Sequence, residues 1–180
     1  MVEEKKDFLQ YELGILTLNA SLATRTSLHP VYAQGITTKQ SSMVRRAIRQ
    51  QLVELQALYV KGGQSEADHI AVISHLANQI SQSHQAWLHQ GRFRFGVAQK
   101  LINLYLKYLW CAELIAEPPH CPIDGIIRDL ANLDYYWISN DSAQDYINAI
   151  SQLKIIAAPN SLALWELQEF RRPEQNPPIS

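Results

Sequence analysis

The chain has 180 residues, of which 47% are hydrophobic and 18% charged, and its formal net charge is -1. This composition is typical of one globular domain with a sizeable core, and it excludes a disordered chain. A net charge near zero excludes a global field that attracts nucleic acid or an anionic membrane, so any electrostatic recognition depends on local clusters.

The sequence also bears on the cellular location of the chain and on the redox state of its two cysteines. The first residues, MVEEKKDFLQ, mix charges and lack the apolar stretch of a secretory signal. The most apolar window, residues 97–116, carries two lysines and a glutamate, which a bilayer-spanning helix does not tolerate. We therefore expect a cytoplasmic protein without a membrane partner, in which Cys111 and Cys121 are reduced thiols.

The first half of the chain reads as helices joined by one long connection. Apolar residues recur at helical spacing over residues 3–22, which predicts the first helix. A connection rich in hydroxyl residues follows over 24–42, with a short extended stretch around 31–32. A second helix is predicted over 42–60, and the Gly-Gly pair at 62–63 ends it.

Two further long helices follow. A capping-box pattern at Ser65 and Asp68 opens the third, which runs to about residue 90. The fourth, over 92–117, has apolar or aromatic residues on most of its circumference, which predicts a central position in the fold. The Pro-Pro pair that follows ends it, because proline lacks the backbone N–H and clashes with the preceding turn.

Three shorter helices are predicted after the prolines. The first begins near Pro122, which suits the first position of a helix, and the others span about 142–155 and 161–170 behind serine caps. The aromatic connector 135–137 has two interpretations. It plugs a seam between helices, which we favour, or it stacks on bases or ring ligands.

These elements define the fold class and the domain organisation. Successive helices without a strand predict an all-α, single-domain bundle of about six or seven helices around the apolar helix 92–117. We expect this domain to span residues 1–172. The polar, proline-containing residues 173–180 are predicted to be a disordered tail.

A helical projection of residues 92–117 gathers the polar side chains into one sector whose charges are all positive. This cationic stripe comprises Arg92, Gly96, Gln99, Lys100, Asn103 and Lys107. Such cationic and amide groups bind phosphate oxygens. The leading hypothesis is a non-catalytic binding protein that holds a phosphate-bearing ligand, a nucleotide or nucleic acid, on the stripe. The alternative is an ordinary solvent face, since lysine stems cover apolar neighbours.

A second basic cluster, Arg45, Arg46 and Arg49, lies near the start of the helix predicted over 42–60. Cations at a helix N-terminus oppose the macrodipole by roughly a few tenths of a kcal/mol each, so we expect a partner for them. Three partners for these arginines stay open: phosphates, an acidic protein surface and the acidic region 113–145 of the same chain. The second hypothesis is therefore a protein-interaction module, or homodimer, that pairs this face with an acidic surface.

The turn PPHCPID places His120, Cys121 and Asp124 at the start of a helix. A helix N-terminus and a neighbouring imidazole lower the pKa of a thiol, which makes a Cys/His enzyme the third hypothesis. The alternative is a rigid turn in which Cys121 fills space. His120 is also a candidate ligand contact at the mouth of a site on the cationic stripe.

Neither a metal nor another cofactor is predicted. The helix predicted to end near residue 90 contains four histidines: His69, His75, His84 and His89. Their spacings do not place two imidazoles on one helix face, as a zinc site requires. The chain also lacks a glycine-rich phosphate loop, a G-x-S-x-G elbow and an HExxH motif.

Overall fold

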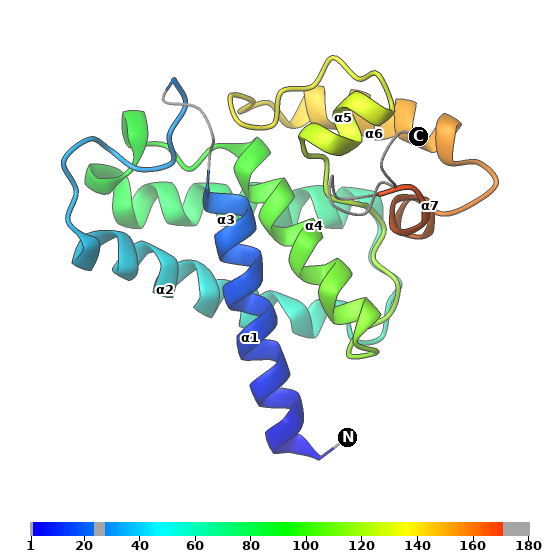
Figure 1. The fold of residues 1–180 in the computed structure, drawn as a ribbon, viewed down its shortest axis with the longest axis horizontal. Helices are drawn as coiled ribbons and strands as arrows, with labels where there is room; N and C mark the ends of the chain where they lie inside the picture. The colour runs from blue at the N-terminus through cyan, green and yellow to red at the C-terminus, as the bar shows by residue number, and fades with distance from the viewer. Residues whose placement is uncertain (1, 24–27, 171–180) are drawn as a thin grey trace, which may run out of the picture.

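A computed structural model describes residues 2–23 and 28–170 of the chain (Figure 1). Its helices are α1 (Glu3–Leu22), α2 (Thr38–Gln56), α3 (Glu66–His84), α4 (Phe95–Cys111), α5 (Gly125–Leu130), α6 (Ala143–Ala157) and α7 (Leu162–Glu169). Short 3-10 turns are η1 (Ala57–Tyr59), η2 (Gln85–Trp87) and η3 (His89–Gly91). The predicted all-α, single-domain class is confirmed. Within the described ranges, the one β element is an isolated bridge.

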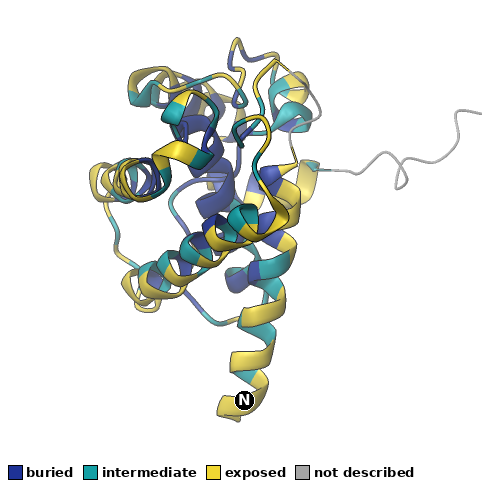
Figure 2. Cartoon of the chain, turned by 90° about the vertical axis from the view of Figure 1, so that its left-hand side faces the viewer, coloured by how far each residue is buried: buried dark blue, intermediate teal, exposed yellow. Residues whose placement is uncertain are grey.

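The central position predicted for the apolar helix is also confirmed. Of the 17 residues of α4, 12 are buried, and Figure 2 shows buried residues concentrated in the interior of the helical bundle. Helices α1, α2 and α3 pack against α4. Tyr146 of α6 and Glu166 of α7 hydrogen-bond to its side chains. Because α4 is apolar on most of its circumference, the fold is built around it.

Serine side chains decide where three of the helices begin. Ser65, Ser142 and Ser161 each accept a hydrogen bond from the backbone N–H three residues later. Each hydroxyl thereby satisfies one of the N–H groups that a helix leaves without an internal partner. The starts of α3, α6 and α7 are therefore those that the capping patterns predict.

The second helix begins earlier than predicted, at Thr38. Thr37 and Gln40 form a reciprocal capping box, which the search for hydrophobic periodicity did not detect. Arg45 consequently lies about two turns inside the helix. The macrodipole acts mainly within the first turn, so the expected penalty on the basic cluster does not apply.

The third helix ends earlier than predicted, at His84, because the following backbone pairs with an extended segment. Ala33 N donates to Trp87 O at 3.0 Å, and His89 N donates to Val31 O at 3.0 Å. These bonds confirm the short extended stretch predicted near residue 32. They also use backbone groups of residues 87 and 89 that a continued helix would need for its own hydrogen bonds.

The central helix is shorter than its predicted range. It begins at Phe95, because Arg92 and Arg94 have extended backbone conformations. At the other end Glu113 adopts a left-handed φ of 60° and Leu114 N donates to a carbonyl of the last turn at 2.9 Å. This reversal stops the helix before the Pro-Pro pair.

Two expectations concern the limits of the domain and the membrane. The predicted disordered tail, 173–180, lies outside the described residues. None of the helices in the described part of the chain has the length and apolar character needed to cross a bilayer.

Candidate functional site

The polar sector of α4 lies against the rest of the fold, not against open solvent. Gln99 and Asn103 are fully buried, and Lys100 is 9% exposed. Buried amides require hydrogen-bond partners, and here the partners come from three other parts of the chain. Of the predicted ligand contacts, Gln99, Asn103 and His120 are brought together in one buried polar network.

Gln99 fixes the loop that carries His120. Its Nε2 donates to Ile123 O at 2.7 Å, and its Oε1 accepts from Ile123 N at 3.2 Å. A backbone carbonyl can only accept and a backbone N–H can only donate, so the orientation of the amide is determined. The Oε1 atom of Gln99 also accepts from Asn103 Nδ2 at 3.3 Å.

The fixed orientation of Gln99 determines the orientation of the Asn103 amide as well. Its Nδ2 donates to Gln99 and to the Tyr146 hydroxyl at 3.0 Å, which leaves Oδ1 as the acceptor. His69 Nε2 lies 2.8 Å from that oxygen and therefore carries the ring proton. In the neutral imidazole, Nδ1 then accepts from the Tyr59 hydroxyl at 2.7 Å.

The same reasoning assigns the proton of His120. The Tyr146 oxygen accepts from Asn103, and its O–H donates to His120 Nδ1 at 2.9 Å. Neutral His120 consequently carries its proton on Nε2. That atom is buried and has no hydrogen-bond partner among the described residues. The donor and acceptor roles in the network are therefore fixed, and it ends at the N–H of His120 Nε2, which has no acceptor among the described residues.

Burial keeps both imidazoles of the network neutral. It lowers the pKa of His69 to about 4, although the hydrogen bond to Asn103 opposes the shift. It lowers the pKa of His120 to about 3, with further contributions from His69 and Lys154. The two rings meet edge to face with 4.8 Å between their centroids, so a charge on one disfavours a charge on the other. Near neutral pH the network is uncharged and joins α3, α4, α6 and the loop before α5.

Acidic groups from the C-terminal half lie opposite the cations of the stripe. Lys107 Nζ lies 2.7 Å from one carboxylate oxygen of buried Glu166 and donates to the other at 2.8 Å. Lys100 Nζ lies 3.9 Å from a carboxylate oxygen of Asp124 and 4.1 Å from the centroid of the Trp137 ring. The partners of these two predicted ligand contacts are thus groups of the same chain.

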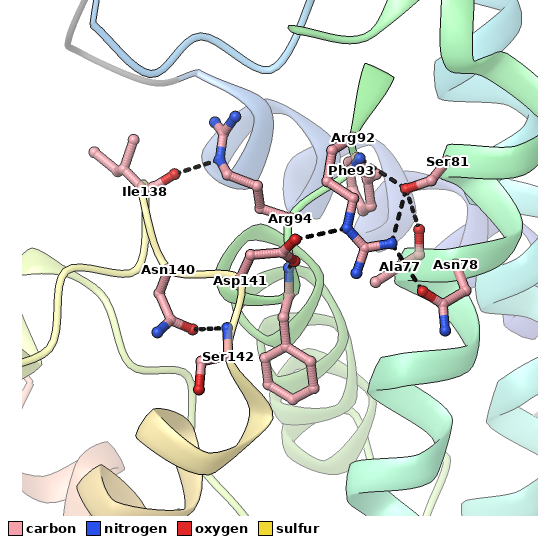
Figure 3. Close-up of polar contacts among 11 residues, drawn as sticks. Ala77, Asn78, Ser81, Arg92, Phe93, Arg94, Ile138, Asn140, Asp141 and Ser142 are labelled. Atoms are coloured by element: carbon pink, nitrogen blue, oxygen red, sulfur yellow. Dashed lines mark hydrogen bonds and ion pairs between the residues drawn. The ribbon is translucent and has the colours of Figure 1, made fainter. Parts of the chain in front are cut away.

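Arg92, the third cation of the stripe, joins three elements. Its Nε donates to Asp141 at 2.7 Å, and its Nη1 donates to Asn78 and Ser81 of α3 at 2.8 and 3.3 Å (Figure 3). The second oxygen of Asp141 accepts from Phe95 N at 2.8 Å. Asp141 therefore caps α4 from a distant loop and neutralises the arginine beside it.

Arg94 is a buried cation that no sequence pattern singled out. Its Nε donates to Ile138 O at 2.7 Å, and its Nη2 donates to the carbonyls of His29 and Pro30 at 2.9 and 3.0 Å (Figure 3 shows the bond to Ile138). Burial lowers the pKa of Arg94 from its ordinary value. This guanidinium ties together two loops that are far apart in the sequence, and nothing local distinguishes it from a solvated arginine.

Gly96 of the cationic stripe permits a close backbone approach, and the approaching group is the chain itself. A Cβ atom at this position would lie 2.0 Å from Trp137 O. Gly96 N also donates to Asn140 O at 3.0 Å. The predicted role of the aromatic connector fits this contact, since Trp137 is buried against Lys100 of α4 and Tyr135 is buried against Tyr146 of α6.

Of the two interpretations of Cys121, its burial agrees with the space-filling one and not with a reactive thiol. The side chain is 1% exposed, and burial raises the pKa of its thiol. Asp124, not Cys121, caps α5 by accepting from the first N–H groups of that helix at 3.0 and 3.2 Å. The His120 imidazole bonds to Tyr146, not to the thiol. The structure thus uses the three proposed catalytic residues for packing, capping and the buried network.

The basic cluster of α2 holds α1 in place. Arg45 donates to the side chain of Asn19. The Arg49 guanidinium lies 4.6 Å from the centroid of the Tyr11 ring. Arg46 is exposed. Two of the three arginines therefore have partners in α1, and these partners are uncharged.

The N-terminal part of α1 extends beyond the rest of the fold (Figures 1 and 2). All buried residues of this helix lie within 14–22. Ahead of them Phe8 is 67% exposed and Tyr11 is 50% exposed. A shallow hollow on the projecting segment is lined by Val2, Lys5, Phe8 and Leu9. This apolar surface was not predicted as a site, because the sequence pattern marks it only as an amphipathic helix.

Among the described residues, no group of three or more His, Cys, Asp or Glu side chains could hold a metal ion. Comparison with protein-family models, with curated proteins and with solved structures finds no match to this chain.

Proposed function

We propose that this chain is a non-catalytic protein-interaction module whose binding element is the projecting half of α1. The proposal is carried by the exposed apolar surface of a helical segment that has no buried residue before Gly14. A short helical segment with few tertiary contacts is marginally stable in water. Burying a side chain such as Phe8 contributes about 1.5 to 3 kcal/mol. A partner that covers this surface therefore stabilises the segment and the complex together.

The interior supports a non-catalytic role. Cys121 and His120 are buried, so a substrate reaches them only when the fold opens. Lys107 holds a carboxylate of α7, and Arg92 holds a capping aspartate. These groups join elements of the fold, which leaves the surface as the part of the molecule that is available for recognition.

Binding of a phosphate-bearing ligand at the cationic stripe stays a prediction. A ligand at Lys107 has to displace Glu166, whose carboxylate then remains buried without its counter-ion. Titration with nucleotides and oligonucleotides at low salt, followed by tryptophan fluorescence, tests it. Binding that is lost in the Lys100→Ala/Lys107→Ala variant supports this alternative, and an unchanged signal rejects it.

The pairing of the basic cluster with an acidic partner surface also stays a prediction. Arg45 and Arg49 contact α1, and Arg46 is exposed. Exposed ion pairs are screened by salt, so a complex formed through this cluster has a strongly salt-dependent dissociation constant. A complex that is equally stable at low and high salt contradicts this role for the arginines.

The proposed function is tested with a photo-crosslinking phenylalanine analogue in place of Phe8, irradiated in the cells that produce the protein. The matched control places the same analogue at Ile155, which is 80% exposed on α6. We expect a discrete adduct from position 8, and its loss when Leu16→Glu is added on the same helix face. The proposal fails if position 8 gives no adduct, or no more than position 155.

A further inference from the structure

One face of α1 has the spacing of a coiled-coil seam. Five residues follow one another at intervals of three, four, three and four, the heptad spacing of positions that meet a second helix. They are Val2, Lys5, Leu9, Glu12 and Leu16. Phe8 and Ile15 lie beside this seam. Val2, Phe8 and Leu16 are each more than half exposed, so the seam has no complete cover within the chain.

The two charged residues of the seam are arranged symmetrically. Lys5 and Glu12 are equally distant along the chain from a point between Phe8 and Leu9. In an antiparallel pair of α1 helices centred on that point, Lys5 lies opposite Glu12 of the second copy, and the reverse pair forms as well. In a parallel pair each charge lies opposite its own copy, which is unfavourable. The order of charges therefore selects an antiparallel second copy.

The same register also brings apolar side chains together. Phe8 lies opposite Leu9 of the second copy, and Val2 lies opposite Ile15 of the second copy, whereas Leu16 lies past Val2 of the second copy. Each of the other charged residues within 3–7 lies opposite an uncharged one. The buried residues of α1 begin at Gly14, so the bodies of the two copies lie at opposite ends of the paired segment.

We propose that two copies of this chain pair through Val2 and residues 3–15 of α1, antiparallel, about a two-fold axis between Phe8 and Leu9. The inference rests on the proposed function, because it names the partner of the same helix face. A two-fold axis closes the assembly at a dimer. The paired segment is about 21 Å long at 1.5 Å per residue, which is a small interface, so the dimer dissociates on dilution.

The test is sedimentation of the full chain over a range of concentrations, with charge reversals on the seam. Lys5→Glu and Glu12→Lys each turn two attractive pairs into two repulsive ones, and each raises the dissociation constant by about tenfold. Mixing the two single variants restores both attractive pairs, so the mixture associates as tightly as the wild type. Asp7→Lys, an exposed position on the opposite side of the same helix, is the matched control and leaves the dissociation constant unchanged.

Each other outcome overturns the inference. A wild-type chain that stays monomeric at millimolar concentration has no such dimer. Single variants that associate as tightly as the wild type indicate a different face or a parallel pair. If the wild type is monomeric and the crosslinker at position 8 captures a different protein, this inference fails and the proposed function stands. If the crosslinker at position 8 captures neither a second copy nor another protein, both the inference and the proposed function fail.

Discussion

The interior around α4 and the projecting half of α1 carry similar sequence patterns and have opposite fates. Both are helices with charged residues threaded through apolar ones. Lys107 of α4, and Arg92 just before α4, meet carboxylates from the C-terminal half. In α1, Lys5 and Glu12 lie on an exposed face beside Phe8. The difference teaches that a charged stripe indicates a binding surface only where the fold leaves it uncovered.

The interior also shows how a polar stripe becomes a core. Buried amides are tolerated only when every group finds a partner, and a half-satisfied network is destabilising. Gln99 and Asn103 meet this requirement through backbone groups of Ile123 and the hydroxyl of Tyr146. Variants in the two regions should therefore differ in kind: interior variants change folding, and α1 variants change association.

The largest expected effect is that of Gly96→Ala. Its new Cβ would lie 2.0 Å from a backbone carbonyl, which cannot move as a flexible side chain can. We expect a loss of at least about 4 kcal/mol in the free energy of unfolding, measured by urea denaturation. Gly125→Ala is the control, since nothing lies within 4 Å of its added Cβ. Equal stability of the two variants contradicts the close approach.

Asn103→Ala is expected to come next. It removes the partner of His69 Nε2, of the Tyr146 hydroxyl and of Gln99 Oε1. His69 Nε2 is left without its partner, whereas the Tyr146 hydroxyl keeps its bond to His120 and Gln99 Oε1 keeps its bond from Ile123 N. A buried group left unsatisfied costs about 1 to 3 kcal/mol and each lost hydrogen bond about 1 kcal/mol, so we expect a loss of roughly 4 kcal/mol. Asn148→Ala, the same change at an exposed position of α6, should alter stability by no more than about 0.5 kcal/mol. Denaturation curves that coincide for the two variants rule out the network.

The pH dependence should follow from the two buried histidines. Their pKa values, about 4 for His69 and about 3 for His120, lie below the ordinary value of 6.5, so the unfolded chain binds protons more readily. Stability is therefore lost as the pH falls below 6.5. Between pH 7 and pH 5 we expect a loss on the order of 3 kcal/mol in the free energy of unfolding. His69→Gln or His120→Gln should remove about half of this dependence, and an unchanged slope in both excludes their role.

The smallest expected effect on folding is that of Phe8→Ala. At concentrations where the chain is monomeric, the exposed ring has few contacts to lose, so we expect a change within about 0.5 kcal/mol. The same variant should weaken association in the sedimentation experiment. A large loss of monomer stability would show that Phe8 belongs to the folded body and would remove the contrast between the two regions.

Local patterns predicted much of the fold because their causes are local. The capping serines Ser65 and Ser142 begin α3 and α6 where predicted, since a hydroxyl reaches only the N–H groups of the next turn. Long apolar periodicity identified α4 as the central helix. The helix ends were less accurate where a distant segment intervened, as with the bridge between Tyr32 and Leu88.

The candidate sites were predicted less well, because their chemistry depends on neighbours that are remote in sequence. His69 was considered only as a metal ligand, whereas its partner Asn103 lies 34 residues away. The carboxylate that meets Lys107 comes from α7, 59 residues later. The sequence left a reactive and a space-filling Cys121 both open, and burial, which raises the pKa of the thiol, agrees with the second. None of these pairings has a local signal.

The sequence by itself determined the helices, the caps that start them and the central place of the apolar one, because these follow from side-chain spacing within a few turns. Only the tertiary structure decided which polar side chains are buried with partners inside the fold and which helix face stays exposed to solvent. Burial and pairing depend on which surfaces the folded chain brings together. For this protein they enclose the stripe on α4 and leave the first turns of α1 exposed.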